Sequence, residues 1–228
     1  MDSGVVAGMD LGSRMGNEHN AIGWTPSIKR GRGSAAAKRA FDIVLSGAAL
    51  LALLPGLLLI ALAVMIETPG PALFRQRRTG IDGKVFTILK FRSMTVAEDG
   101  EHIAHATRND KRVTRVGQFL RQTSLDELPQ LINVLRGDMA VVGPRPHAKA
   151  HDLHYGALLP SYNERFKVLP GLTGLAQIHG LRGEIHQLSC MARRIEADIA
   201  YTRTWSFRGD LLIILRTFPL LIRRVNAY

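Results

Sequence analysis

A single uncharged apolar segment limits what this chain can fold into. The residues from Ile43 to Ile66 include no charged side chain, and the segment exceeds the ~20 residues that a membrane helix needs. It begins too far from Met1, and is too long, to be the apolar part of a cleaved signal peptide. The sequence therefore predicts a membrane-embedded helix, with a buried core helix as the alternative.

Two features of this segment argue against a straight crossing. Pro55 and Gly56 lie at its centre, and a proline there removes a helical hydrogen bond and favours a kink or break. Basic residues also flank both sides, within 29–39 and 75–92. Because positive charge in short flanks stays in the cytoplasm, we expect a re-entrant helix that bends at Pro55 and returns. A kinked span is the alternative.

The segments on either side differ in composition. Residues 1–37 are rich in Gly, Ser and Asn and are predicted to form a flexible basic tail. Residues 38–68 are predicted to contain the re-entrant helix, and residues 69–228 are predicted to form a compact cytoplasmic catalytic domain with membrane-surface helices. The net charge of +11 suits polyanionic partners. Cys190 is the single cysteine, so no intrachain disulfide can form.

The compact domain is predicted to be α+β, mainly helical with one short β-hairpin. Alternating residues and a turn between them favour two strands, and amphipathic patterns favour three helices. The apolar C-terminal stretch Leu211–Ile222 is too short to span a membrane but suits a helix in the interface plane; a core helix is an equal alternative. The predicted strands are Ala72–Arg77 and Lys84–Leu89, and the predicted helices are Val113–Gln122, Leu125–Leu135 and Leu188–Thr204.

The adjacent carboxylates Asp126 and Glu127 allow two interpretations. They could hold a divalent cation, or one could attack phosphorus while the other assists. Alternatively, Ser124 and Glu127 have the spacing of a capping box. Acidic residues are also favoured in a first helical turn by the helix dipole. The two interpretations are compatible, since a carboxylate at a helix N-terminus stays ionised, as a nucleophile requires.

Four cations are candidates for binding phosphate. Lys90, Arg92, Arg121 and Arg145 lie beside turns and at the ends of elements rather than along one helix face. Arg145 lies between two prolines, which present its side chain rigidly for bidentate recognition. The alternative is that each is an ordinary solvated charge.

Three histidines suggest a different site. His147, His151 and His154 have the spacing i, i+4 and i+7, which would place them on one helix face where they could bind zinc. No HExxH motif accompanies them, so a zinc hydrolase is the weakest of the functional hypotheses.

Taken in order, several short motifs resemble the bacterial sugar transferases, the monotopic phosphoglycosyl transferases. The resemblance runs from Lys38 to the C-terminus, and the ordered set is much more specific than any one motif. The motifs are Lys38–Asp42, Lys90–Met94, the Arg121–Gln130 segment containing SLDELPQ, Asn133–Met139, Val142–Pro146, Pro170–Gly174 and Tyr201 with Trp205 and Ser206.

The resemblance implies a concrete reaction. Such enzymes transfer a sugar 1-phosphate from a nucleotide diphosphate sugar to undecaprenyl phosphate and initiate exopolysaccharide or glycoconjugate synthesis. By position, Asp126 would be the nucleophile that forms a covalent aspartyl-phosphosugar, and Glu127 its partner, with Mg²⁺ bound near both. Lys90, Arg121 and Arg145 match the family's phosphate contacts. The helix broken at a proline is also a family feature.

The resemblance has departures and leaves questions open. Leu54 precedes Pro55 where some relatives have serine, and no block of further membrane helices precedes Lys38, so a minimal catalytic form is expected. Residues 180–184 are similar to relatives that use UDP-glucose, although Ile185 and His186 replace a polar continuation. UDP-glucose is thus the first expected donor and UDP-galactose the second.

The expected setting is the bacterial inner membrane, with a monotopic chain whose active site is on the cytoplasmic face. The expected partners are a UDP-sugar, undecaprenyl phosphate and membrane lipids, with no nucleic acid; a homodimer is left open. The alternative function is a non-catalytic membrane-surface module that binds anionic lipid.

Overall fold

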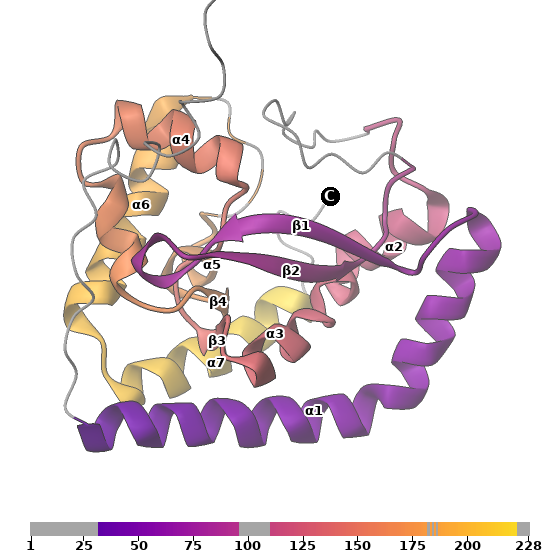
Figure 1. Ribbon diagram of the computed structural model, residues 1–228, viewed down its shortest axis with the longest axis horizontal. Coiled ribbons are helices and arrows are strands. Elements are labelled where there is room, and N and C mark those ends of the chain that lie inside the picture. Colours follow the sequence, from indigo (N-terminus) through magenta and orange to yellow (C-terminus); the bar gives the residue numbers. More distant parts are fainter. Residues whose placement is uncertain (1–31, 96–109, 182, 184, 186, 223–228) are drawn as a thin grey trace, which may run out of the picture.

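The computed structural model describes residues 32–95, 110–181, 183, 185 and 187–222. It confirms the predicted class, a mainly helical α+β fold with a short hairpin (Figure 1). The helices are α1 (Arg32–Glu67), α2 (Arg115–Thr123), α3 (Gln130–Arg136), α4 (Lys149–Leu158), α5 (Leu175–Ile178), α6 (Leu188–Thr204) and α7 (Phe207–Ile222). The strands are β1 (Leu73–Thr79), β2 (Val85–Phe91), β3 (Ala140–Val142) and β4 (Gly171–Thr173), and the 3-10 helices are η1 (Ile81–Gly83), η2 (Leu125–Glu127) and η3 (Tyr162–Lys167).

Helix α1 runs along one side of the molecule and then changes direction, so that the rest of the chain lies inside the bend (Figure 1). Pro55 lies within this helix and supplies a physical cause for the bend, because its ring cannot donate the helical hydrogen bond. The helix begins at Arg32 rather than Lys38, so residues 32–37 belong to it and not to the predicted tail. The rest of that tail, residues 1–31, lies outside the described residues.

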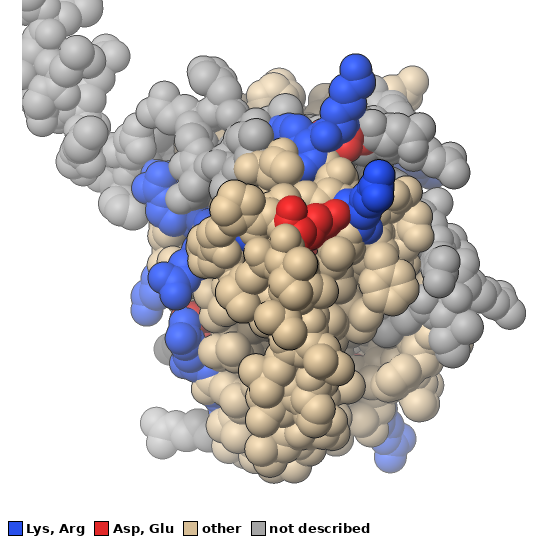
Figure 2. All heavy atoms as spheres, turned by 90° about the vertical axis from the view of Figure 1, so that its right-hand side faces the viewer, with Lys and Arg blue, Asp and Glu red and all other residues tan. Residues whose placement is uncertain are grey.

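The outer side of α1 is an apolar surface. It is the one helix in the described part of the chain that is long and apolar enough to cross a membrane, and only 6% of its most apolar window is buried. That exposure rules out the alternative of a buried core helix. Figure 2, which faces the rising part of α1, shows a broad uncharged surface with most Lys and Arg side chains toward its upper and left borders. The exposed side chains include Val44, Leu51, Leu58, Leu59 and Ile66.

Both ends of α1 are fastened to the same domain. At the start, the buried Lys38 lies 3.1 Å from Asp42 and 2.8 Å from Asp210 of α7. Arg39 donates to the carbonyl oxygens of Val134 and Leu135, at 2.5 and 2.8 Å, at the end of α3. Arg39 thus binds two of the last carbonyls of α3, where the helix no longer supplies every partner, although the Val134 carbonyl also accepts from Gly137 N–H.

At the far end, Glu67 accepts hydrogen bonds from the backbone N–H groups of Arg115 and Val116, at 2.7 and 3.0 Å. A carboxylate in that position caps the N-terminus of α2 and complements its dipole. Arg92 donates to the carbonyl oxygens of Thr68 and Pro69, at 2.7 and 2.5 Å. The bend of α1 is therefore held between two anchored ends.

Two small sheets stand between the helices. Strands β1 and β2 form the predicted antiparallel hairpin, with Leu73 opposite Phe91 and Thr79 opposite Val85. Strands β3 and β4 form a parallel pair, which the sequence did not predict because each has three residues and shows no alternating pattern. Helix α7 corresponds to the predicted C-terminal interface helix, and its Leu212, Leu215 and Phe218 side chains are exposed.

Candidate active site

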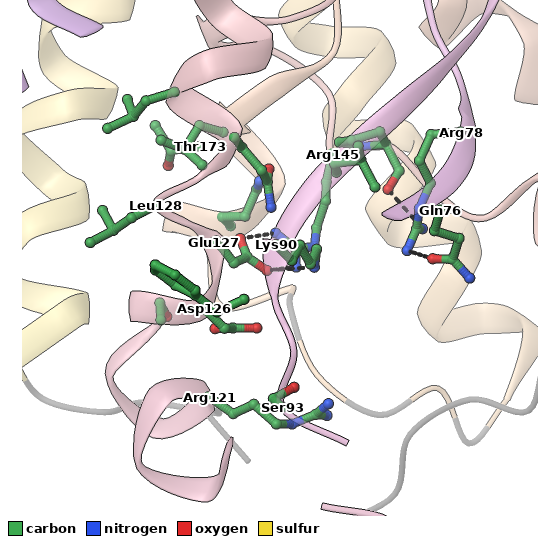
Figure 3. A pocket seen from close by; sticks show the side chains of 18 of the residues that line it. Gln76, Arg78, Lys90, Ser93, Arg121, Asp126, Glu127, Leu128, Arg145 and Thr173 are labelled. Carbon is green, nitrogen blue, oxygen red and sulfur yellow. Dashed lines mark hydrogen bonds and ion pairs between the residues drawn. The ribbon is translucent and has the colours of Figure 1, made fainter. Parts of the chain in front are cut away.

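A carboxylate held by two cations lies in a pocket of the molecule (Figure 3). Lys90 of β2 donates to Glu127 Oε1 at 3.1 Å. Arg145, which follows β3, donates Nη1 to Glu127 Oε2 at 2.9 Å and Nη2 to Glu127 Oε1. A guanidinium that binds both oxygens of one carboxylate fixes the orientation of both groups. Three of the predicted site residues are therefore in direct contact.

Asn133 positions this carboxylate against the hairpin. Its side chain is fully buried, accepts from Leu89 N at 3.0 Å and donates to Thr87 O at 2.7 Å. Helix α3 is thereby attached to β2 beside Lys90. Since η2 leads into α3 through Leu128 and Pro129, the attachment also brings Asp126 and Glu127 to the hairpin.

The predicted capping box at Ser124 is wrong. Ser124 has φ 57° and ψ 18° and makes no side-chain cap hydrogen bond, and the segment is a 3-10 helix followed by α3 rather than one helix over Leu125–Leu135. The left-handed conformation of Ser124 instead ends α2, whose Arg121 carbonyl accepts from the Ser124 N–H. Glu127 is thus free to face Lys90 and Arg145.

Glycines allow the Arg145 segment to lie directly against the turn before α5. A β-carbon on Gly171 would lie 2.0 Å from Gly143 N, and one on Gly174 would lie 2.2 Å from Gly143 O. Contacts this short with backbone atoms exclude any larger residue. The two Gly- and Pro-rich motifs of the sequence therefore pack against each other and fix the backbone from which Arg145 projects.

Asp126 has a different environment from its neighbour. Its side chain is buried, and no hydrogen bond to it occurs among the described residues. Burial, and then the charge of Glu127, raise the pKa of Asp126 to about 6, against the opposing effect of Lys90, Arg121 and Arg145. At neutral pH it is an ionised, poorly solvated carboxylate that points into the pocket (Figure 3).

Glu127 and Lys90 each oppose the effect of burial on the pKa of the other. Burial alone would raise the pKa of Glu127, but Arg145 and Lys90 outweigh it and hold that pKa well below its usual value. Burial likewise lowers the pKa of Lys90, while Glu127 opposes the change. The pair of carboxylates therefore divides into one fixed charge, Glu127, and one carboxylate with no fixed partner, Asp126.

These groups line a cavity of about 620 Å³. One part is polar and includes Asp126, Arg121 and Arg145, while another part is apolar and is lined by residues of α1 and α7. The apolar lining includes Leu45, Ala49 and Leu53 of α1 and Ile214 and Phe218 of α7. The cavity thus joins a charged centre to the two helices that expose apolar surface.

The remaining predicted cations are placed differently. Arg121, in the last turn of α2, lines the cavity near Asp126 (Figure 3). Arg92 also lines it, but its guanidinium donates to carbonyl oxygens at the end of α1. Its role as a phosphate ligand stays a prediction, and the observed role is to anchor α1.

The three histidines do not converge on one point. His147 precedes α4 and faces Tyr162, whereas His154 packs on Tyr155 with ring centroids 4.9 Å apart. In the part of the chain that the structure describes, no group of three or more His, Cys, Asp or Glu residues could hold a metal ion. The spacing that suggested zinc therefore does not produce a zinc site there.

Comparisons with known proteins show the family to which the chain belongs. The pattern of the family described as bacterial sugar transferase matches residues 33–224. A UDP-glucose:undecaprenyl-phosphate glucose-1-phosphate transferase of Caulobacter vibrioides is 58% identical over 84% of this chain and 72% of its own length. The protein of the same name from Escherichia coli K12 is 54% identical over 79% of this chain but 39% of its own length.

More distant relatives act on other sugars. A UDP-N-acetylgalactosamine-undecaprenyl-phosphate N-acetylgalactosaminephosphotransferase of Aeromonas hydrophila is 36% identical over 83% of this chain and 44% of its own length. The match of the family pattern to most of the chain, together with the identity to the Caulobacter protein, is decisive. The chain therefore belongs to the bacterial sugar transferase family of phosphoglycosyl transferases.

Proposed function

We propose that the chain transfers a sugar 1-phosphate from a UDP-sugar, UDP-glucose before UDP-galactose, to undecaprenyl phosphate and releases UMP. The observation that carries the proposal is Asp126, a buried carboxylate without a hydrogen-bond partner in the described residues, next to cations that suit a diphosphate. The relatives at 58% and 54% identity are named for UDP-glucose and undecaprenyl phosphate, which supports this choice of donor and acceptor. The residues that favoured UDP-glucose in the sequence include Arg182 and Glu184, which lie outside the described residues.

The proposed reaction has two displacements at one phosphorus. Asp126 attacks the phosphorus that bears the sugar, the phosphoanhydride bond to UMP breaks, and an aspartyl-phosphosugar forms. A phosphate oxygen of undecaprenyl phosphate then attacks the same phosphorus, which restores the Asp126 carboxylate and yields the lipid diphosphate sugar. Covalent catalysis of this kind replaces one difficult step by two easier ones.

The cations have separate tasks in this proposal. Lys90 and Arg145 hold Glu127 and place positive charge where phosphate oxygens would bind, while Arg121 lines the cavity near Asp126. Transfer of a phosphoryl group depends mostly on positioning and on stabilising oxygen charge. Glu127 would act mainly by orienting these cations beside the nucleophile.

Mg²⁺ is the proposed cofactor, and the residues fit it in part. Asp126 can offer a carboxylate oxygen, whereas both oxygens of Glu127 already accept from Arg145. Mg²⁺ is commonly bound by one or two carboxylates together with substrate phosphates, so Asp126 and the donor's diphosphate would hold it. It would neutralise charge on the diphosphate.

The proposed setting is the inner membrane, with both ends of α1 and the site on the cytoplasmic face. The anchoring of both α1 ends to one domain supports this arrangement. With Cys190 replaced by Ser, an impermeant thiol reagent outside spheroplasts should label neither Ser34→Cys nor the control Lys84→Cys in the exposed hairpin turn. Labelling of Ser34→Cys alone would show that α1 crosses the membrane.

A panel of UDP-sugars tests the reaction. Purified protein with Mg²⁺ and undecaprenyl phosphate should release UMP, with the largest kcat/KM for UDP-glucose. The lipid product should carry the sugar from the same donor. No release of a nucleoside monophosphate from any nucleotide sugar, with retained binding to anionic lipid, would favour the non-catalytic membrane module instead.

Replacing Arg145 with Lys should lower kcat/KM by roughly 10- to 100-fold, although the charge is kept. A lysine is a point donor and cannot bind both oxygens of Glu127, so the carboxylate would lose its fixed orientation. Arg136→Lys, at the end of α3 and outside the cavity lining, is the matched control. Turnover of Arg145→Lys equal to that of the control would remove Arg145 from the phosphate site.

A further inference from the structure

A second polar region of the cavity is built around His147. The ring is buried, and its Nδ1 lies 2.9 Å from Arg165 Nη1 and 2.8 Å from the Tyr162 hydroxyl. A guanidinium can only donate, so Nδ1 must be an acceptor. In a neutral imidazole the hydrogen is then on Nε2.

The surroundings keep this imidazole neutral. Burial lowers the pKa of His147 well below its usual value, and the positive charge of Arg165 acts in the same direction. Arg165 is itself fixed, because its Nη2 donates to Asp198 Oδ2 at 2.9 Å. The neighbours of Nδ1 on the inner side of the ring therefore fix the tautomer of His147.

On the other side of the ring, Nε2 is a donor without a described partner. His147 lines the cavity, and within the described part of the chain its buried Nε2 has no hydrogen-bond partner. A buried donor without a partner costs about 1–3 kcal/mol. Such a group in a cavity wall indicates that a ligand supplies the acceptor.

Two glutamines that line the same cavity share this property. Gln177 of α5 is buried, and neither its Nε2 nor its Oε1 has a partner among the described residues. Gln130, the first residue of α3, is also buried with an unpartnered Nε2. Three separate segments thus bring side chains with three unpartnered donors and one unpartnered acceptor to the lining of one cavity.

This set differs in chemistry from the phosphate end. The groups around Asp126 are charged, whereas His147, Gln130 and Gln177 are neutral and combine donors with an acceptor. Sugar hydroxyl groups both donate and accept, and they need no opposite charge. A polar site of this type also discriminates strongly between donors, because a mismatched ligand leaves buried groups unpaired.

We propose that His147 and Gln177, assisted by Gln130, form the subsite that binds the hydroxyl groups of the donor's sugar. The inference rests on the proposed function and deepens it, since it assigns residues that select the sugar rather than residues that react. His147 would donate from Nε2, and the Gln177 amide would donate to one hydroxyl oxygen and accept from another.

Matched substitutions at His147 separate binding from structure. His147→Asn keeps an oxygen near the position of Nδ1, so it can still accept from Arg165, but it removes the donor in the cavity. His147→Gln places an amide N–H near the position of Nε2 and loses the inner acceptor. His154→Asn, on α4 and outside the cavity lining, is the control.

Equilibrium binding of UDP-glucose and UMP is measured in Asp126→Asn protein, which should bind the donor without consuming it. His147→Asn should weaken UDP-glucose roughly tenfold, the effect of one lost hydrogen bond, and leave UMP unchanged. His147→Gln should bind UDP-glucose more tightly than His147→Asn but unfold at a lower temperature. The control should match the parent in both measurements.

Gln177→Leu covers the case in which His147→Asn does not fold. It removes both amide atoms without taking a partner from another described residue, so it should fold at least as stably while losing affinity for UDP-glucose and not for UMP. Equal losses for UMP and UDP-glucose would place the nucleoside there and overturn the assignment. Unchanged UDP-glucose affinity in the folded variants would also overturn it, and UMP release by the wild type would show separately whether the proposed function stands.

Discussion

Asp126→Asn should abolish UMP release and at the same time make the folded protein more stable. The amide cannot attack phosphorus, so turnover should fall by about 10⁴-fold or more, as it does when a nucleophile is removed. The same change removes a poorly solvated negative charge, since burial and Glu127 raise the pKa of Asp126 to about 6. Loss of activity and gain of stability should therefore occur together.

The stability effect has a defined pH dependence. Because the carboxyl pKa is higher in the folded state than in the unfolded chain, ionisation of Asp126 destabilises the fold. The full effect is present above about pH 6, and it disappears below the unfolded pKa near 4. Asp126→Asn should thus gain about 1–3 kcal/mol at pH 7.5, and the difference should shrink as the pH falls toward 4. Thermal unfolding in detergent measures it.

Asp82→Asn is the control for this experiment, because Asp82 is exposed in the hairpin turn with φ 51°, a conformation that asparagine also adopts. It should leave turnover and stability unchanged. Substantial UMP release by Asp126→Asn would show that another group is the nucleophile.

Asp210→Ala should destabilise the fold by about 3–5 kcal/mol, the usual cost of removing one partner of a buried ion pair. Asp210 is fully buried and lies 2.8 Å from Lys38 Nζ, 2.9 Å from the Tyr201 hydroxyl and 3.1 Å from Trp205 Nε1. Its loss would leave Asp42 as the remaining carboxylate beside Lys38. The fraction of monodisperse protein after heating, measured by size-exclusion chromatography, reports the change.

Glu164→Ala provides the contrast for Asp210→Ala. Glu164 pairs with Arg203, whose side chain is 63% exposed, and an exposed pair contributes about 0–1 kcal/mol. A similar loss for both variants would mean that the Lys38 network does not stabilise the junction between α1 and α7.

Local patterns predicted part of the regular structure. The hairpin and α6 were found because alternation, turn residues and helical periodicity are properties of a few adjacent residues. The grouping of Asp126 with Lys90 and Arg145 came from the resemblance to a family, since no local pattern says that residues so far apart in sequence meet. In the structure Asn133 and the glycines of two loops bring them together.

Residues with long-range partners were assigned less well. Ser124 and Glu127 have the spacing of a capping box, but Ser124 ends the preceding helix and Glu127 turns to Lys90 and Arg145. Arg92 was expected to bind phosphate, which stays a prediction, and its anchoring of α1 was not foreseen. His147 was considered only as a metal ligand, because neither the Arg165 contact nor the cavity beside its ring could be read from spacing.

The anchoring of α1 has a consequence for attempts to prepare a soluble fragment. Val64, near the end of α1, is buried in a cluster with Phe91 and Leu120, and Lys38 near the start is buried against α7. Deletion of residues 1–67 would remove Val64 and Lys38, expose Phe91 and Leu120, and leave Asp210 without its cation. The membrane element is thus a structural part of the catalytic body, and detergent or lipid nanodiscs, rather than deletion, are the way to handle this chain in solution.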